Sequence, residues 1–177
     1  MPRFRHSRFG QRLRRPGRVV IFTYMPLPTK GPVPSLGGAM LRYRPIVPIG
    51  VFGPLGLRFL DGCVDCGADD TIFPLSLARK LGIDLTGAPQ GEAHPVGGTI
   101  VPYLYASVTL RITDGLEICE WQAMVGFVDL PLRWALLGHA GFLDFFDAEL
   151  RGARREISIA PNSLLPGTHS TQQTPTP

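Results

Sequence analysis

The sequence contains no apolar stretch close to the roughly 20 residues that a membrane-spanning helix needs. It has only three cysteines, Cys63, Cys66 and Cys119, and so small and odd a number does not make the disulfide framework of a secreted domain. These two absences predict a protein that works without a membrane partner in a reducing compartment, and we assign it to the cytoplasm.

Acidic residues are missing from residues 1–39, which carry seven Arg and one Lys and therefore a charge of +8. Residues 40–177 hold ten basic and fourteen acidic side chains, a charge of −4. A nucleic-acid partner is therefore expected only through this Arg-rich leader. The leader is also rich in Pro and Gly, and we expect a disordered extension; a true start at Met40, or a signal peptide interrupted by Pro26 and Pro28, are the alternatives.

The rest of the composition is that of a globular protein, with 44% hydrophobic and 18% charged residues. Glycine (21) and proline (18) are abundant, which favours many turns and short strands over long helices. We expect one folded domain over residues 40–160. Residues 161–177 are dominated by Ser, Thr, Gln and Pro and predict a disordered tail.

Apolar alternation and turn residues predict a mostly β structure within that domain. A helix of about two turns is expected over residues 74–81, and one or two further helical turns over 140–146. A hairpin with a flexible tip is expected around Gly97 and Gly98. Together these elements indicate a small closed β-barrel with one or two short helices, its strands expected over 44–52, 57–64, 100–112, 116–128 and 155–160.

A run of chemically informative residues follows the second of these strands and precedes the helix: Asp65-Cys66-Gly67-Ala68-Asp69-Asp70-Thr71. An Asp-x-Gly triplet at the end of a strand presents a carboxylate on a tight turn. Cys63 and Cys66 also match Cys-x-x-Cys, but a zinc site needs a second pair of ligands, and only Cys119 and scattered histidines remain. We therefore expect no metal and no cofactor.

This run resembles the active-site motif of the retropepsins, the single-domain aspartic proteases of retroviruses and their cellular and bacterial relatives. Six of its seven positions are identical to the retroviral pattern. Two further blocks lie in the family's order: residues 95–98 fall where the family carries its flap hairpin, and residues 135–138 resemble the apolar-apolar-Gly block that leads into a C-terminal helix. The resemblance covers residues 42–160.

The resemblance implies an aspartic endopeptidase in which Asp65 is catalytic and Gly67 offers its backbone amide. Peptide hydrolysis of this kind needs a water held between two carboxylates, one ionised and one protonated. The chain has one Asp-x-Gly at such a position, so the second carboxylate must come from another copy, in a homodimer. The resemblance also implies substrate or interface contacts, in residues Ala68, Asp69, Asp70, Gly97, Gly98 and His139.

Two residues depart from the family pattern. Cys66 occupies the place of a Thr or Ser whose hydroxyl joins the two catalytic loops, and a thiol is a weaker donor, so we expect a dimer less stable by about 1 kcal/mol. His139 occupies the place of an Arg that pairs with the residue matching Asp69. It would form that pair only when protonated; the alternative is a neutral His with a local hydrogen bond.

The same residues are compatible with a second function. A domain that keeps the fold and loses catalysis would be a silent dimerisation or peptide-binding module. The peptide or protein substrate is not specified by the sequence, because the side chains that would form its pockets lie on strands whose mutual arrangement the sequence does not give.

Overall fold

The computed structural model describes residues 19–94 and 98–172. This part of the chain is mostly β, as expected, with one short α-helix, α1 (Leu75–Leu81), and one 3-10 turn, η1 (Pro34–Leu36). Neither described helix has the length and apolar character that crossing a bilayer requires. The strands are β1 (Val20–Thr23), β2 (Met25–Val33), β3 (Ala39–Arg44), β4 (Ile46–Gly53), β5 (Gly56–Val64), β6 (Ile72–Pro74), β7 (Gln90–Ala93), β8 (Val101–Thr113), β9 (Glu117–Val128), β10 (Ala135–Leu137), β11 (Phe146–Arg151), β12 (Glu156–Pro161) and β13 (Thr168–Thr171).

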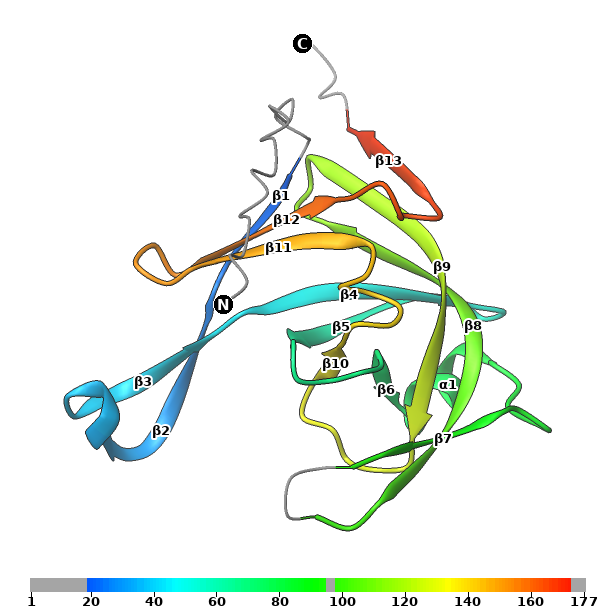
Figure 1. Ribbon diagram of the computed structural model, residues 1–177, viewed down its shortest axis with the longest axis horizontal. Helices are drawn as coiled ribbons and strands as arrows, with labels where there is room; N and C mark the ends of the chain where they lie inside the picture. Colours follow the sequence, from blue (N-terminus) through cyan, green and yellow to red (C-terminus); the bar gives the residue numbers. More distant parts are fainter. Residues whose placement is uncertain (1–18, 95–97, 173–177) are drawn as a thin grey trace, which may run out of the picture.

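Six strands form a closed barrel (Figure 1). Their order is β9-β6-β10-β5-β4-β8, and the ring closes because β8 also pairs with β9. The pairs β10–β5 and β6–β9 are parallel and the others in the ring are antiparallel. The closed β-barrel expected from the sequence is therefore confirmed, and β7 and β13 extend it at the free edges of β8 and β9.

The barrel is filled by alternate residues of its long strands, because successive side chains of a strand point to opposite faces. Leu110 of β8 lies opposite Trp121 of β9, and both are almost fully buried. Helix α1 adds Leu77, Ala78 and Leu81 to the same core. Gly82 ends the helix with a positive φ of 67°, a left-handed conformation that glycine adopts without strain.

A second sheet, β1-β12-β11, lies beside the barrel and corrects the expected leader boundary. Val20 pairs with Ile159 and is fully buried in the main core, so the expectation of disorder fails for residues 19–39, while residues 1–18 lie outside the described part. The short apolar run around Val20 gave no strand signal of its own because its partner is at the other end of the chain. Burial against β12 stabilises it.

The expected tail also contains structure. β13 pairs antiparallel with β9, with His169 opposite Cys119, so disorder fails for residues 161–172 and residues 173–177 are not described. His169 Nε2 lies 2.9 Å from Glu117 Oε2 on a largely covered part of the surface. The strand was not predicted because its residues are polar and show no apolar alternation.

The helical turns expected over residues 140–146 are not formed, and a series of tight turns leads directly into β11. The reason is aromatic packing. Phe142 and Phe146 pack against the ring of Trp121, with ring centroids 6.0 and 4.8 Å apart. The Trp121 indole N–H donates to the Gly141 carbonyl at 2.9 Å, which fixes the turn to the barrel.

Candidate active site

The Asp65 loop begins where β5 ends, beside the parallel strand β10. The Asp65 N–H donates to the Leu137 carbonyl at 3.1 Å, which ties the start of the loop to the end of β10. Gly62 of β5 permits this approach, since a Cβ there would lie 2.8 Å from the Leu137 side chain. The block at residues 135–138 thus lies directly behind the loop, as its resemblance implied.

The loop is held by short hydrogen bonds of its own backbone. The Gly67 N–H donates to Asp65 Oδ1 at 2.9 Å, and the Ala68 N–H donates to the Asp65 carbonyl at 3.2 Å. The first bond fixes the orientation of the half-buried Asp65 carboxylate. The Gly67 amide therefore contacts the Asp65 carboxylate directly.

Gly138 lies against the far side of this loop without room for a side chain. A Cβ at this position would be 2.4 Å from the Asp70 carbonyl oxygen and 2.6 Å from that of Ala68. Two hydrogen bonds follow directly: the His139 N–H donates to the Ala68 carbonyl at 2.9 Å, and the Ala140 N–H donates to the Asp69 carbonyl at 2.8 Å. Residues 138–140 thus form a backbone bracket that sets the shape of the loop.

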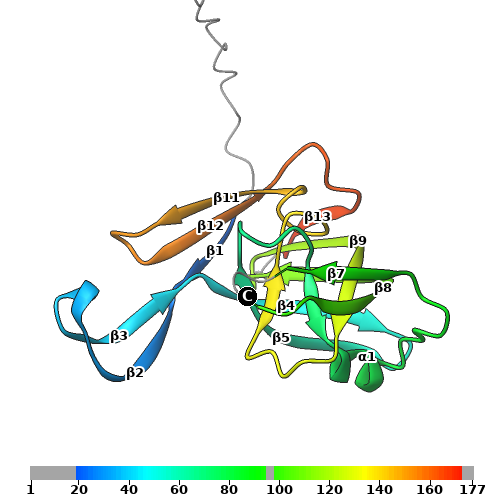
Figure 2. The same ribbon diagram turned by 60° about the horizontal axis from the view of Figure 1, so that its bottom comes forward.

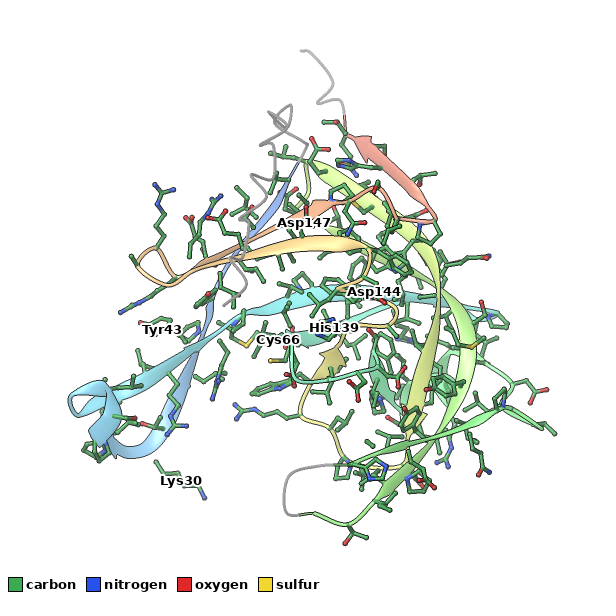
Figure 3. The ribbon with its side chains drawn as sticks, in the orientation of Figure 1. Lys30, Tyr43, Cys66, His139, Asp144 and Asp147 are labelled. Carbon is green, nitrogen blue, oxygen red and sulfur yellow. The ribbon has the colours of Figure 1, made fainter. Side chains whose placement is uncertain are left out.

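Cys66 and His139 lie at the exposed end of this bracket (Figure 3). The His139 Nε2 lies 3.2 Å from the Cys66 carbonyl oxygen. Because a carbonyl can only accept, Nε2 carries the proton in this bond. The structure thus gives His139 a local hydrogen bond within its own chain, which is the alternative to the pair with Asp69, and leaves the Cys66 thiol exposed.

Asp70 is bound by two tyrosines of β8 that the sequence did not single out. Its Oδ2 accepts hydrogen bonds from the Tyr103 hydroxyl at 2.6 Å and the Tyr105 hydroxyl at 3.0 Å. Burial, and then the bond to Asp70, raise the pKa of Tyr103 well above its ordinary value, so that hydroxyl remains a donor. Neither Asp69 nor Asp70 caps α1, because no side chain caps that helix. The sequence did contain a pattern that could have indicated these partners: the two tyrosines are two residues apart and so lie on one face of a strand.

The Tyr103 ring reaches Asp70 across two glycines. A Cβ on Gly126 would lie 2.5 Å from the ring, and one on Gly91 would lie 2.6 Å from it. Both glycines lie on strands that pair with β8, so the ring packs over bare backbone on each side. The absence of these two side chains is what brings the tyrosine hydroxyl to the carboxylate.

These residues border a cleft of about 410 Å³. Asp65 and the backbone of the loop form one side, and residues of β7 and the start of β8 form another. The expected hairpin is present as the β7–β8 pair, with Ala93 opposite Val101. At its tip Gly98 is exposed, whereas Gly97 lies outside the described residues. The lining is Asp65, Gly67, Ala68, Asp69, Asp70, Ile72, Glu92, Ala93, His94, Val101, Tyr103, Val128, Leu130, Leu132 and Leu136.

The cysteines do not assemble into a metal site in the described part of the chain, where no three His, Cys, Asp or Glu side chains converge. Cys63 is half-buried, and burial followed by the negative charge of Asp65 raises its pKa. Cys119 is buried in the core, which raises its pKa to about 11. Both thiols are therefore held in their protonated form at neutral pH.

No protein-family model matches the chain, and no curated protein matches it in sequence. Among solved structures the fold is similar to the crystal structure of a retropepsin-like aspartic protease from Rickettsia conorii, with a TM-score of 0.51. The two chains share 15% sequence identity, and the match covers 88% of this chain and 94% of the other. At this identity the comparison establishes the architecture: the chain has the retropepsin-like fold.

Proposed function

We propose that this protein is an aspartic endopeptidase whose catalytic dyad consists of Asp65 from each of two copies. The observation that carries the proposal is the Asp65 carboxylate itself, oriented by the Gly67 amide at the edge of a cleft in a retropepsin-like fold. One chain supplies one such carboxylate, and a general acid and a general base are both required. The site is complete only in a dimer.

In the proposed mechanism the two Asp65 carboxylates share one proton, because two negative charges held so close are not both stable. The ionised carboxylate accepts a proton from a water molecule as the water oxygen attacks the peptide carbonyl carbon. The protonated carboxylate donates its proton to the carbonyl oxygen. The carboxylate that took the water proton then donates it to the amide nitrogen, while the other carboxylate accepts a proton from a hydroxyl group of the tetrahedral intermediate. The C–N bond breaks, and the dyad is again singly protonated.

The cleft suits an extended peptide. Apolar side chains from three parts of the fold line it, among them Val101, Val128 and Leu136, and they would receive apolar substrate side chains. The β7–β8 hairpin lies over the same cleft and would cover the bound peptide. Asp69 and Asp70 contribute carboxylates beside the loop, where peptide N–H groups would find acceptors.

The test is cleavage of a peptide library between pH 4 and 7 by the wild-type chain and by Asp65→Asn. We expect Asp65→Asn to lower kcat/KM by about 10²- to 10⁴-fold, since it removes the group that moves the proton. Asp61→Asn is a matched control, because Asp61 is an exposed carboxylate on the preceding strand. Equal activity of Asp65→Asn and wild type would refute the assignment.

A second function is favoured by one observation, the exposed Cys66 thiol at the position of the expected hydroxyl lock. With that lock weakened, the domain would act as a catalytically silent peptide-binding module. A wild-type dimer that binds library peptides and cleaves none of them across the same pH range would establish this alternative.

A further inference from the structure

The hairpin formed by β2, η1 and β3, residues 25–44, which we call the arm, is a two-stranded sheet separate from both larger sheets. Figures 1 and 2 show it projecting from the body of the molecule in both views. Within the arm, all of which is described, Val33 is the one buried residue. An isolated two-stranded hairpin is only marginally stable in water. The arm therefore lacks a covering surface.

The base of the arm is nonetheless fixed in direction. Arg155, in the turn between β11 and β12, accepts a hydrogen bond from the Tyr24 N–H through its carbonyl oxygen at 2.6 Å. Its guanidinium group also stacks on the Tyr43 ring, 3.7 Å from the centroid. Arg155 has a positive φ of 54°, a conformation that costs a non-glycine residue energy and that these two contacts sustain. The arm is held at its root while its length is uncovered.

The uncovered length presents apolar side chains in one place. Leu36, Met40 and Leu41 are 48%, 51% and 39% exposed. All three line one groove of about 810 Å³ between the arm and the β11–β12 turn. Exposed apolar side chains gathered in one groove on a projecting element are typical of a surface that binds another protein.

The charge of the arm indicates which protein it would bind. The arm contains three basic residues and no acidic residue, whereas residues 45–177 contain eight basic and fourteen acidic residues, a charge of −6. Lys30, Arg42 and Arg44 of the arm line a second groove of about 550 Å³. The rest of the chain is thus opposite to the arm in net charge, so a second copy offers both the opposite charge and a matching arm.

The arm also lies on the appropriate side of the molecule. Figure 3 places Cys66, beside the candidate catalytic Asp65, on the flank of the barrel from which the arm projects, with Tyr43 and Lys30 further out. A strand of nine residues such as β2 spans about 30 Å. An arm of that length extends outward on the side of the barrel where Cys66 lies.

We propose that the arm is a clasp that binds a second copy of this chain, with Leu36, Met40 and Leu41 on the partner's surface and the arm's basic side chains facing its carboxylates. This inference rests on the proposed homodimeric protease. It adds an interface outside the catalytic loop, one that offsets the weak lock expected of Cys66. By twofold symmetry each copy is held by its own arm and by its partner's.

The test compares full-length variants in sedimentation equilibrium. In the arm variant Leu36→Ser, Met40→Ser and Leu41→Ser are combined; all three sites are exposed, so the fold is retained, which circular dichroism checks. We expect the dimer dissociation constant to rise at least tenfold. The matched control combines Leu55→Ser, Leu116→Ser and Leu164→Ser, which are 73%, 61% and 67% exposed and lie outside the arm, and should leave it unchanged.

A charge variant addresses the second half of the proposal. Arg42→Glu with Lys30→Glu should weaken the dimer, most strongly at low salt, while Arg58→Glu with Lys80→Glu, two exposed basic residues outside the arm, should not. Dimer constants equal to wild type in both arm variants would overturn the inference and leave the protease proposal intact if the wild type cleaves peptides. Arm variants that dimerise normally and lose binding to single-stranded oligothymidylate would overturn it in favour of a polyanion site. An arm-dependent dimer that cleaves no peptide would support the clasp and contradict the protease.

Discussion

Replacing Gly138 by Ala tests whether the backbone bracket behind the Asp65 loop sets the loop's shape. The new Cβ would lie 2.4 Å from the Asp70 carbonyl oxygen, whereas ordinary contact begins at 3.4 Å, so the loop and the bracket must separate by about 1.0 Å. Both opposing atoms are backbone, and no side-chain rotation relieves the contact. The bond from the His139 N–H to the Ala68 carbonyl, 2.9 Å in the native loop, would lengthen beyond hydrogen-bonding range.

The magnitude follows from those contacts. Two backbone hydrogen bonds contribute about 0.5–1.5 kcal/mol each, and forcing a methyl group into a packed site costs about 1–3 kcal/mol. Since movement of the loop relieves part of the second cost, we expect a loss of about 2–3 kcal/mol in the free energy of unfolding. If Asp65 is catalytic, as proposed, displacing its carboxylate by this distance should also lower kcat/KM by about 10²-fold.

Urea unfolding of Gly138→Ala and of Gly152→Ala measures the effect. Gly152 is the control because a Cβ there meets nothing within 4 Å and its φ is not positive. Gly152→Ala should remain within about 1 kcal/mol of wild type. Gly138→Ala with wild-type stability would refute the argument that the bracket is too close for a side chain, whether or not the protein is a protease.

Two further substitutions test the surroundings of the loop. Tyr103→Phe removes the 2.6 Å bond to Asp70 and should lower the free energy of unfolding by about 1–3 kcal/mol at pH 7. Because the native pKa of Tyr103 lies above its unfolded value, the wild type should also lose stability as the pH rises above about 10, by up to about 1.4 kcal/mol per pH unit. An equally steep alkaline loss of stability in the Tyr103→Phe variant, measured by urea titration, would contradict this. Cys66→Thr restores the hydroxyl expected at the lock and should tighten the dimer about fivefold, for about 1 kcal/mol; analytical ultracentrifugation decides, with Cys66→Ala as a control that should not tighten it.

Much of the barrel was predictable because its strands carry local signals. β4, β5, β8 and β9 alternate or run apolar between clear turns, and α1 ends at a glycine. β1 and β13 carried no such signal, since their stability comes from partners far along the chain, β12 and β9. β2 contains three prolines, which a strand without a partner on one side tolerates.

The residues of the candidate site also differ in how far the sequence alone could predict them. Asp65 and Gly67 could be named as candidates from the sequence because the motif that contains them is a short run of consecutive residues. The partners of Asp70 were not, because Tyr103 reaches it only through the pairing of β8 and the bare backbone at Gly126 and Gly91. The helix expected after Gly138 was wrong because the packing of Phe142 and Phe146 on Trp121 outweighs local helix preference.

The bond from the Asp65 N–H to the Leu137 carbonyl has a consequence for the order of folding. Closing the loop of chain between Asp65 and Leu137 costs conformational entropy, and only the contacts of the complete barrel offset that cost. A nascent chain therefore carries the Asp65 run long before β10 and the bracket emerge to shape it. The candidate catalytic loop should acquire its geometry late, so an unfinished chain would have the carboxylate and no working site, and would be unable to cleave its neighbours during synthesis.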